Sequence, residues 1–263
     1  MKQIIVFFLL ILFGIHEKNV AQIISSDSLD NVSIFTTDAL GKIYLVQKGG
    51  IIKTDPQGKI LNTFNLKDYG EPFQLDARDP FKLLVFYRDF GMLRILDNQL
   101  GQQTILDLRQ LGFADPRVIC GTAEQSLWIY DLVTSQLSKL DLNQKKTQLS
   151  IDLRQLLGQA PTPIQMEQSQ KWIAMLTDKE VLIFDQYGTF LKRIPLPDLK
   201  PKLFQLIEDN LYMSQGEKIL RYNLGLNDMA EEPQILPSDC SFARISGAQI
   251  LYIRNGWLVL PSK

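Results

Sequence analysis

Short apolar stretches that end in an aspartate or a similar residue recur along this chain. Runs of four to eight apolar and β-branched residues, bounded by Gly, Asn, Asp or Pro, predict β-strands. In chain order the stretches are IIKTD (51–55), LRILD (93–97), LSKLD (137–141), VLIFD (181–185), ILRYN (219–223) and WLVLP (257–261). Their last residues lie 42, 44, 44, 38 and 38 positions apart. The chain therefore contains an internal repeat of about 40 residues.

Each copy of the repeat divides into four predicted strands. First strands are expected at 32–39, 72–79, 117–124, 163–170, 202–209 and 241–247, and second strands at 42–47, 82–88, 126–132, 171–177, 210–215 and 249–254. The recurring stretches are the third strands. Turns rich in Asn, Asp, Gly and Pro then lead to fourth strands, since tight reversals favour those residues. In the second and third copies the fourth strand is expected to reach residues 111 and 156.

A repeat of this length made only of strands predicts an all-β fold, a six-bladed β-propeller. Strands such as LLVFY (83–87) are apolar on both faces, as expected where neighbouring blades pack on each side. The sixth copy stops at residue 263 without a fourth strand, while 22–26 form an orphan strand before the first copy. We expect this N-terminal strand to pair into the last blade, because an open ring leaves edges unprotected. The sequence thus predicts a single β-propeller domain over 22–263.

The third and fourth strands, with their turn, resemble a known class of repeat. The segments at 181–194 (VLIFDQYGTFLKRI) and 51–64 (IIKTDPQGKILNTF) match the core of six-bladed propellers of the NHL and YVTN type. Other copies depart from it: we expect an insertion at 97–106, no glycine at 141–150 and no aspartate in the sixth copy. The resemblance implies a binding or scaffolding role more often than catalysis, and it brings no catalytic residue with it.

The first 21 residues have the anatomy of a secretory signal peptide. Lys2 precedes an apolar run of twelve residues from Ile4 to Ile15, and a polar stretch and Ala21 follow. The run is shorter than the roughly 18–20 residues of a membrane-spanning helix. We expect cleavage after Ala21 and export to the periplasm or the cell exterior, without membrane insertion of the mature chain. The alternative is an uncleaved anchor.

Composition narrows the chemistry of the mature chain. Without residues 1–21, 26 basic and 28 acidic residues remain, a balance that lacks the basic footprint of a nucleic-acid binder. The only histidine, His16, lies in the expected signal peptide, which excludes imidazole acid–base catalysis and imidazole metal sites. Cys120 and Cys240 fall in opposing blades, whereas a disulfide needs Cα atoms within about 7 Å. We therefore expect two free thiols. Because the mature chain also lacks a motif for a metal or a phosphate group, we expect no cofactor.

Loops on one face of the ring are the predicted binding surface. In a propeller, turns between second and third strands share a face with the links between blades, and binding concentrates in such loops. The candidate residues on this face are Arg88, Asp89, Arg109, Arg117, Arg154, Lys179 and Arg254.

Two of these arginines lie in repeated segments, DLRQL at 107–111 and DLRQL at 152–156. One interpretation makes Arg109 and Arg154 a paired clamp for an acidic partner, because arginine presents a planar fork of donors. The other is duplication, in which the leucines of both segments plug between blades and each arginine is tied to its neighbouring aspartate.

Acidic residues near the starts of the first strands offer a second kind of site at the mouth of the central channel. The charged residues there are Asp30, Glu71, Asp115, Arg117, Lys202 and Asp239. Converging carboxylates bind Ca²⁺ or perform glycosidase chemistry, although loop charges also occur without such a role. Trp128, Trp172 and Trp257 are expected in the core, with a carbohydrate-stacking platform as the alternative.

The leading hypothesis is a monomeric, non-enzymatic propeller that binds a protein partner in the cell envelope, or scaffolds one. A propeller enzyme or sugar-binding protein that uses the channel-mouth carboxylates is the alternative. A third possibility is a passive structural part of a larger envelope assembly.

Overall fold

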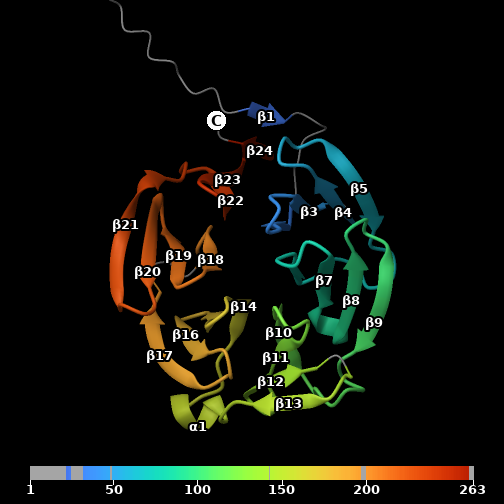
Figure 1. Ribbon diagram of the computed structural model, residues 1–263, viewed down its shortest axis with the longest axis vertical. Coiled ribbons are helices and arrows are strands. Elements are labelled where there is room, and N and C mark those ends of the chain that lie inside the picture. Colours follow the sequence, from blue (N-terminus) through green and yellow to red (C-terminus); the bar gives the residue numbers. More distant parts are fainter. Residues whose placement is uncertain (1–21, 25–31, 48, 142, 197–199, 261–263) are drawn as a thin grey trace, which may run out of the picture.

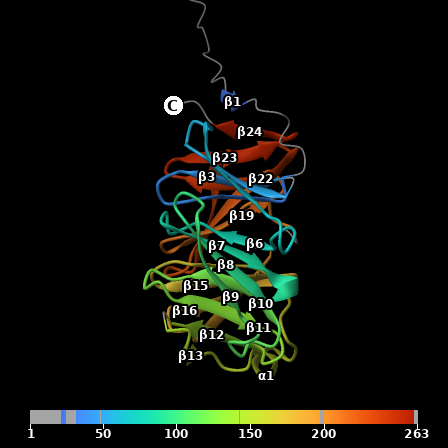
Figure 2. The same ribbon diagram turned by 90° about the vertical axis from the view of Figure 1, so that its right-hand side faces the viewer.

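The strands are arranged as a ring of radial sheets (Figure 1). The computed structural model describes residues 22–24, 32–47, 49–141, 143–196 and 200–260. Within these residues the strands form six four-stranded sheets, which we number as blades one to six in chain order. Seen from its edge, the ring is a flattened disc (Figure 2). The expected all-β, six-bladed propeller is confirmed.

In each blade the first strand lies nearest the axis and the later strands follow outward (Figure 1). Blade one comprises β2 (Ile34–Thr37), β3 (Ile43–Gln47), β4 (Gly50–Thr54) and β5 (Ile60–Asn65). Blade two comprises β6 (Gln74–Asp76), β7 (Lys82–Tyr87), β8 (Met92–Asp97) and β9 (Gln102–Asp107). Blade three comprises β10 (Pro116–Gly121), β11 (Leu127–Asp131), β12 (Gln136–Leu140) and β13 (Lys146–Leu149). Blade four comprises β14 (Pro163–Gln168), β15 (Trp172–Thr177), β16 (Glu180–Asp185) and β17 (Phe190–Pro195). Blade five comprises β18 (Phe204–Ile207), β19 (Asn210–Gln215), β20 (Lys218–Asn223) and β21 (Asp228–Ile235). Blade six comprises β22 (Cys240–Ser246), β23 (Gln249–Arg254), β24 (Trp257–Leu260) and β1 (Gln22–Ile24).

The outer strand of blade six comes from the other end of the chain. β1 runs antiparallel to β24, with Gln22 opposite Leu260 and Ile24 opposite Leu258. The sheet order is β1-β24-β23-β22, so this pairing completes the sixth blade. The expected signal peptide, residues 1–21, lies outside the described residues.

The core lies between the blades. The described residues contain six clusters of buried apolar side chains, one at each junction between neighbouring blades. In β11, Leu127 and Ile129 pack towards blade two, whereas Trp128 and Tyr130 pack towards blade four. Successive side chains of a strand point to opposite faces, so a strand that is apolar throughout serves two junctions at once. Trp128 is fully buried, which fits the core interpretation for this tryptophan.

One turn recurs between third and fourth strands. In blade four, Asp185 Oδ1 accepts the backbone N–H groups of Tyr187 (2.9 Å) and Thr189 (2.9 Å), and Gly188 adopts φ +83°. The turns that begin at Asp55, Asp97 and Asp141 bond in the same way.

The turn at Asp97 has the same length as the other turns, so the prediction of an insertion at 97–106 is wrong. Leu100 takes the left-handed position at φ +62°, and Gln144 takes it at φ +61° in the next blade, so these turns keep the same length without glycine there. In both blades the aspartate side chain accepts two backbone N–H groups and so stabilises the turn without a glycine.

The expected extent of two fourth strands is also wrong. β9 ends at Asp107, whose side chain accepts the backbone N–H of Arg109 and starts a new turn, and β13 ends at Leu149, three residues before Asp152 accepts the N–H of Arg154 in the same way. After Asp152 the chain forms the single-turn helix α1 (Leu153–Leu157), which Gly158 ends in the left-handed conformation. The described residues contain only short helices, none of which could span a bilayer.

Candidate functional site

All seven predicted site residues lie at one end of the ring. First strands start at this end and second strands finish here, so we call it the loop face. Arg88 and Asp89 belong to the 3₁₀ turn η1 (Arg88–Phe90), and Arg154 belongs to α1. The others lie in a turn, at a strand end or in a link: Arg109, Arg117, Lys179 and Arg254.

Arg109 and Arg154 hold the turns of their own blades. Arg109 Nη2 donates to the carbonyl of Asp89 (2.9 Å), and Arg154 Nη2 donates to the carbonyl of Val133 (3.0 Å). Leu108 and Leu153, which precede them, are fully buried. The two arginines thus make equivalent contacts in blades two and three, and each stiffens part of the loop face.

An aromatic hollow of about 360 Å³ opens on the loop face at blade two. Its lining consists of Tyr69, Glu71, Pro72, Phe73, Tyr87, Arg88, Asp89 and Phe90. The Tyr69 ring centroid lies 5.2 Å from that of Tyr87 and 5.6 Å from that of Phe90. The guanidinium carbon of Arg88 stands 3.8 Å above the Phe73 ring. We refer to this set of residues as the aromatic hollow.

Two of the predicted channel-mouth carboxylates are already engaged in ion pairs, and a third, Glu71, lines the aromatic hollow instead. Asp115 pairs with Arg117 (2.6 Å), and Asp239 pairs with Arg254 (2.8 Å). The hydrogen bond from Arg254 lowers the pKa of Asp239, despite the opposing effect of desolvation. Asp30 lies outside the described residues. Among the residues that the structure describes, no group of three or more His, Cys, Asp or Glu side chains could hold a metal ion.

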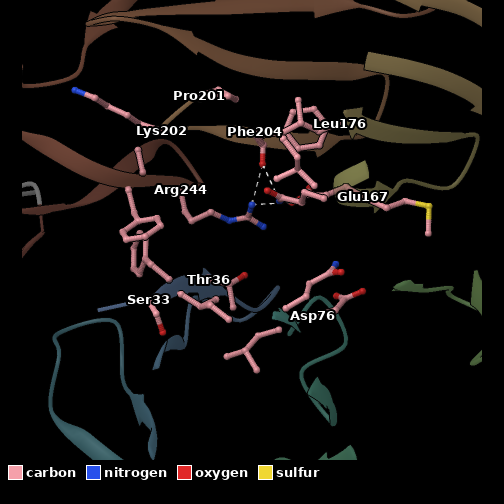
Figure 3. Close-up of a pocket in the computed structure, with 18 of the residues that line it drawn as sticks. Ser33, Thr36, Asp76, Glu167, Leu176, Pro201, Lys202, Phe204 and Arg244 are labelled. Atoms are coloured by element: carbon pink, nitrogen blue, oxygen red, sulfur yellow. Dashed lines mark hydrogen bonds and ion pairs between the residues drawn. The ribbon is translucent and has the colours of Figure 1, made fainter. Parts of the chain in front are cut away.

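A second cavity lies in the channel itself, below the loop face. It measures about 490 Å³, and Figure 3 shows the residues around it. Inner strands β2, β6, β14, β18 and β22 supply its walls, together with the link that carries Lys202. We call this the channel cavity.

Arg244 and Glu167 form a buried ion pair at the channel cavity. Arg244 Nη1 donates to Glu167 Oε1 (2.7 Å) and to the carbonyl of Phe204 (3.0 Å). Glu167 also accepts the N–H of Leu206 (2.9 Å) and the side-chain amide of Gln165 (2.8 Å). The pair therefore ties blades four, five and six together.

Asp76 and Arg78 form the corresponding pair on the other side of the axis. Asp76 accepts the N–H of Gly121 (2.8 Å), and Arg78 reaches the carbonyl of Gln168 (2.6 Å) in blade four. Burial would raise the pKa of Asp76, but the charge and hydrogen bonds of Arg78 outweigh it and lower the pKa. Both residues also line a cavity of about 680 Å³ at the opposite end of the channel. The pair thus stands between the two cavities.

Sequence reasoning missed Asp76, Arg78, Glu167 and Arg244. Glu167 and Arg244 are 77 positions apart. Although Asp76 and Arg78 are close in sequence, Arg78 also reaches Gln168, which is 90 positions away, so local spacing does not reveal how these residues meet across blades. One signal was available, the alternation Gln-x-Asp or Gln-x-Glu at 74–76 and 165–167 within otherwise apolar first strands. Alternate residues on a first strand face the same way, and these side chains all contact the first strand of the next blade, so the pattern marks the face that meets that blade.

The predicted residues do not converge on one site. Arg88, Asp89 and Arg109 meet at blade two, and Arg88 and Asp89 line the aromatic hollow. Arg117 and Arg254 stand in separate ion pairs in blades three and six. Lys179 lies in the turn between β15 and β16, beside a small hollow of about 100 Å³.

The fold is shared with solved structures of other proteins. A streptogramin B lyase has 15% identity and a TM-score of 0.60, over 88% of this chain and 78% of that chain. A catalytically inactive variant of virginiamycin B lyase from Staphylococcus aureus, with a histidine replaced by alanine and with quinupristin, has 12% identity and a TM-score of 0.56, over 87% and 78%. The WD40 domain of Pan2 from Neurospora crassa has 11% identity and a TM-score of 0.53, over 88% and 90%.

These similarities agree with the fold class that the six sheets define, a six-bladed β-propeller, and at this identity they show the fold alone. No protein-family model matches the sequence, and no curated protein does either.

Proposed function

We propose that this chain is an exported, non-enzymatic binding module that recruits a protein partner in the cell envelope. The observation that carries the proposal is the aromatic hollow on the loop face. Tyrosine, phenylalanine and arginine are enriched at the centres of protein–protein interfaces, and a few such residues supply most of the binding energy. Two of the predicted site residues, Arg88 and Asp89, line this hollow.

The hollow is held rigid from beneath. Arg94 is buried, pairs with Asp68 (2.6 Å) and lies 5.8 Å from the Tyr69 ring and 6.0 Å from the Tyr87 ring. Arg109 fixes the backbone at Asp89 from the side. A surface that is already ordered loses less conformational entropy on binding, so these contacts favour affinity.

Export and the envelope location rest on the N-terminal sequence. The apolar run that begins at Ile4, with Lys2 before it and Ala21 after it, supports a cleaved signal peptide. Fractionation of cells that express the full chain tests this. Recovery of a mature form beginning at Gln22 in the periplasm or medium supports export, and retention of the full chain in the cytoplasm contradicts it.

The enzymatic alternative has weaker support in the site. Asp115 and Asp239, two of the expected acidic groups, are each paired with an arginine. The similar lyase whose inactive variant lacks a histidine offers no direct parallel, because residues 22–263 of this chain contain no histidine. We therefore propose binding through the loop face rather than catalysis at the channel mouth.

Affinity capture from envelope extract, with residues 22–263 as bait, tests the proposed function. Phe90→Ala removes an exposed ring of the hollow, and Arg88→Ala removes the guanidinium over Phe73. Tyr187→Ala, a change to an exposed aromatic residue in a turn at the opposite face, is the matched control. We expect either hollow variant to weaken binding of the captured protein at least about tenfold, as loss of a central contact does.

The control should bind the captured protein like the native chain. Equal capture by the native chain and both hollow variants contradicts the proposed surface. Recovery of no envelope protein by the native chain contradicts the proposed function.

A further inference from the structure

We propose that the channel cavity binds a small organic carboxylate with an apolar body, and that Arg244 is the residue that holds its anionic group. This inference is independent of the protein partner proposed above, since the cavity and the aromatic hollow are different sites. It rests on the unused edge of one guanidinium, the charge of the cavity and the composition of its walls.

Arg244 is buried but only partly satisfied. It is 7% exposed, and both of its hydrogen bonds to other described residues leave from Nη1. Its Nε is buried and has no partner among the described residues. A buried donor without a partner costs free energy, so such groups are rare in folded proteins. Nε and Nη2 form the edge of the guanidinium that accepts a carboxylate in two parallel hydrogen bonds.

The free edge faces the cavity. Figure 3 shows the guanidinium of Arg244 extending towards the space between Glu167 and Thr36. Glu167 already takes hydrogen bonds from Arg244, Gln165 and the Leu206 backbone, so it fixes the guanidinium without occupying this edge. The arginine is thereby preorganised, which lowers the entropic cost of binding an anion.

The charge of the cavity favours an anion. Its lining contains four cationic residues, Arg78, Lys200, Lys202 and Arg244, and two acidic ones, Asp76 and Glu167. Each acidic residue is paired with one of the arginines. Lys200 and Lys202 belong to the link before β18. The ammonium of Lys202 donates to the carbonyl of Ser238 (2.8 Å) and points away from Arg244 (Figure 3), so it adds positive charge to the lining at a distance from the guanidinium.

The walls favour an apolar body behind the anionic group. Phe35, Phe73, Phe204, Phe242 and Leu176 all line the cavity. A volume of about 490 Å³ is in the range of pockets that enclose small ligands, which combine apolar walls with a few fixed polar groups. A neutral sugar would leave the arginine edge unused and would place hydroxyl groups against these rings. The observations therefore favour the amphipathic carboxylate.

Titration calorimetry with matched acids and amides tests the inference on the unmodified chain, residues 22–263. The probes are hexanoate and 3-phenylpropanoate, and their controls are hexanamide and 3-phenylpropanamide, which have similar shape but no charge. We expect saturable one-to-one binding of at least one acid with a Kd below about 10 mM, as suits a ligand of this size. Its amide should bind at least about tenfold more weakly.

Two variants assign the binding to Arg244. Arg244→Lys keeps the positive charge but removes the planar edge, so the acid should bind at least about tenfold more weakly. The double variant Glu167→Gln with Arg244→Gln removes both charges together and leaves no unpaired buried charge, so folding is preserved while acid binding is lost. The matched control is Lys218→Gln with Glu231→Gln, an exposed pair on blade five, which should bind the acid like the native chain.

Absence of saturable binding for both acids overturns the inference, and so does equal binding of an acid and its amide. If a folded Arg244 variant binds the acid like the native chain, the assignment to Arg244 is wrong. Capture of the protein partner by these variants is a separate readout, so failure of this inference is distinguishable from failure of the proposed function.

Discussion

Gln74 and Gln205 show how single side chains join neighbouring blades. Gln74 Nε2 donates to the carbonyl of Ile119 (2.8 Å), and Gln74 Oε1 accepts the N–H of the same residue (3.3 Å). Gln205 makes the same two contacts with Ile245, at 2.9 and 2.8 Å. Each glutamine therefore imitates a short piece of strand pairing between two sheets that share no strand. Hydrogen bonds are directional, so these contacts fix the position of one blade relative to the next, which apolar packing alone does not specify.

The ion pair between Asp76 and Arg78 is the first target for mutation at this scale. Asp76→Asn keeps the shape but leaves Arg78 without its counter-charge. Asp76 is buried and Arg78 is partly buried, so we expect the free energy of unfolding to fall by about 2–4 kcal/mol, somewhat less than for a fully buried pair, because the remaining charge is uncompensated but partly hydrated. Urea denaturation measures the change. In the exposed pair with Lys218, Glu231→Gln should change it little. Equal effects of the two substitutions would show that burial does not decide the outcome.

The two thiols give a prediction about reactivity and pH. Cys120 and Cys240 are free and buried, in blades three and six. Burial raises the pKa of Cys120 from 9.0 to about 12 and that of Cys240 from 9.0 to about 11. The native chain should therefore resist iodoacetamide at pH 8, whereas the unfolded chain takes up two equivalents, since the thiolate is the nucleophile.

The same shifts set an alkaline limit on stability. Each thiol has a higher pKa in the folded chain than in the unfolded chain. Its contribution to the stability of the folded state is therefore complete below pH 9.0, and it is lost as the pH rises towards about 11 for Cys240 and about 12 for Cys120. Melting temperatures measured between pH 8 and pH 11 should fall for the native chain. A Cys120→Ala variant should show a shallower fall, and an identical slope would contradict the role of this thiol.

At the scale of elements, the turn after the third strand decides how blades pack on one another. In blade four the turn at Gly188 lies against Trp128 of blade three, so that a Cβ atom at Gly188 would stand 2.8 Å from the indole ring. The glycine there meets two demands, a left-handed backbone and a close approach. At the equivalent place Gln144 is exposed, so only the backbone demand remains.

Gly188→Ala should destabilise the protein by about 2–4 kcal/mol, the sum of left-handed strain and overpacking against Trp128. Gln144→Gly is the control in the opposite sense: it relieves the strain and should leave the free energy of unfolding unchanged or raise it by up to about 1 kcal/mol. Chemical denaturation of both variants checks this. A harmless Gly188→Ala would mean that the turn moves away from the indole.

The elements also show what could be predicted from sequence and what could not. Third strands and their turns were recognisable, because the aspartate and the apolar run are local and repeat with a fixed period. The apparent insertion at 97–106 arose because Leu100 fills a glycine place, and only the backbone angle reveals the equivalence. The channel cavity escaped prediction because Glu167 and Arg244 are 77 positions apart and each looks like an isolated polar residue within a strand.

For the whole molecule, the junction between β1 and β24 makes the ring continuous. Deleting residues 22–30 removes β1 and exposes the edge of β24. We expect the melting temperature to fall by at least about 5 °C, since a lost strand affects the sheet and both neighbouring junctions. Removal of residues 1–21 alone is the control and should leave the melting curve of the ring intact. A deletion that melts with the native chain would count against closure by this strand.

The pairing of β1 with β24 also constrains the order of events during folding. The strand at 22–24 has no mate until the segment at 257–260 has been synthesised, more than two hundred residues later. Contacts between segments so distant in sequence form slowly, because the conformational entropy of closing a long loop is lost before the contact contributes any stabilising energy. Five blades can assemble from neighbouring segments as they emerge, whereas the sixth must wait for the last one. The pairing that closes the ring is therefore a late step in folding, and the export proposed above would have to engage the chain before this step is complete.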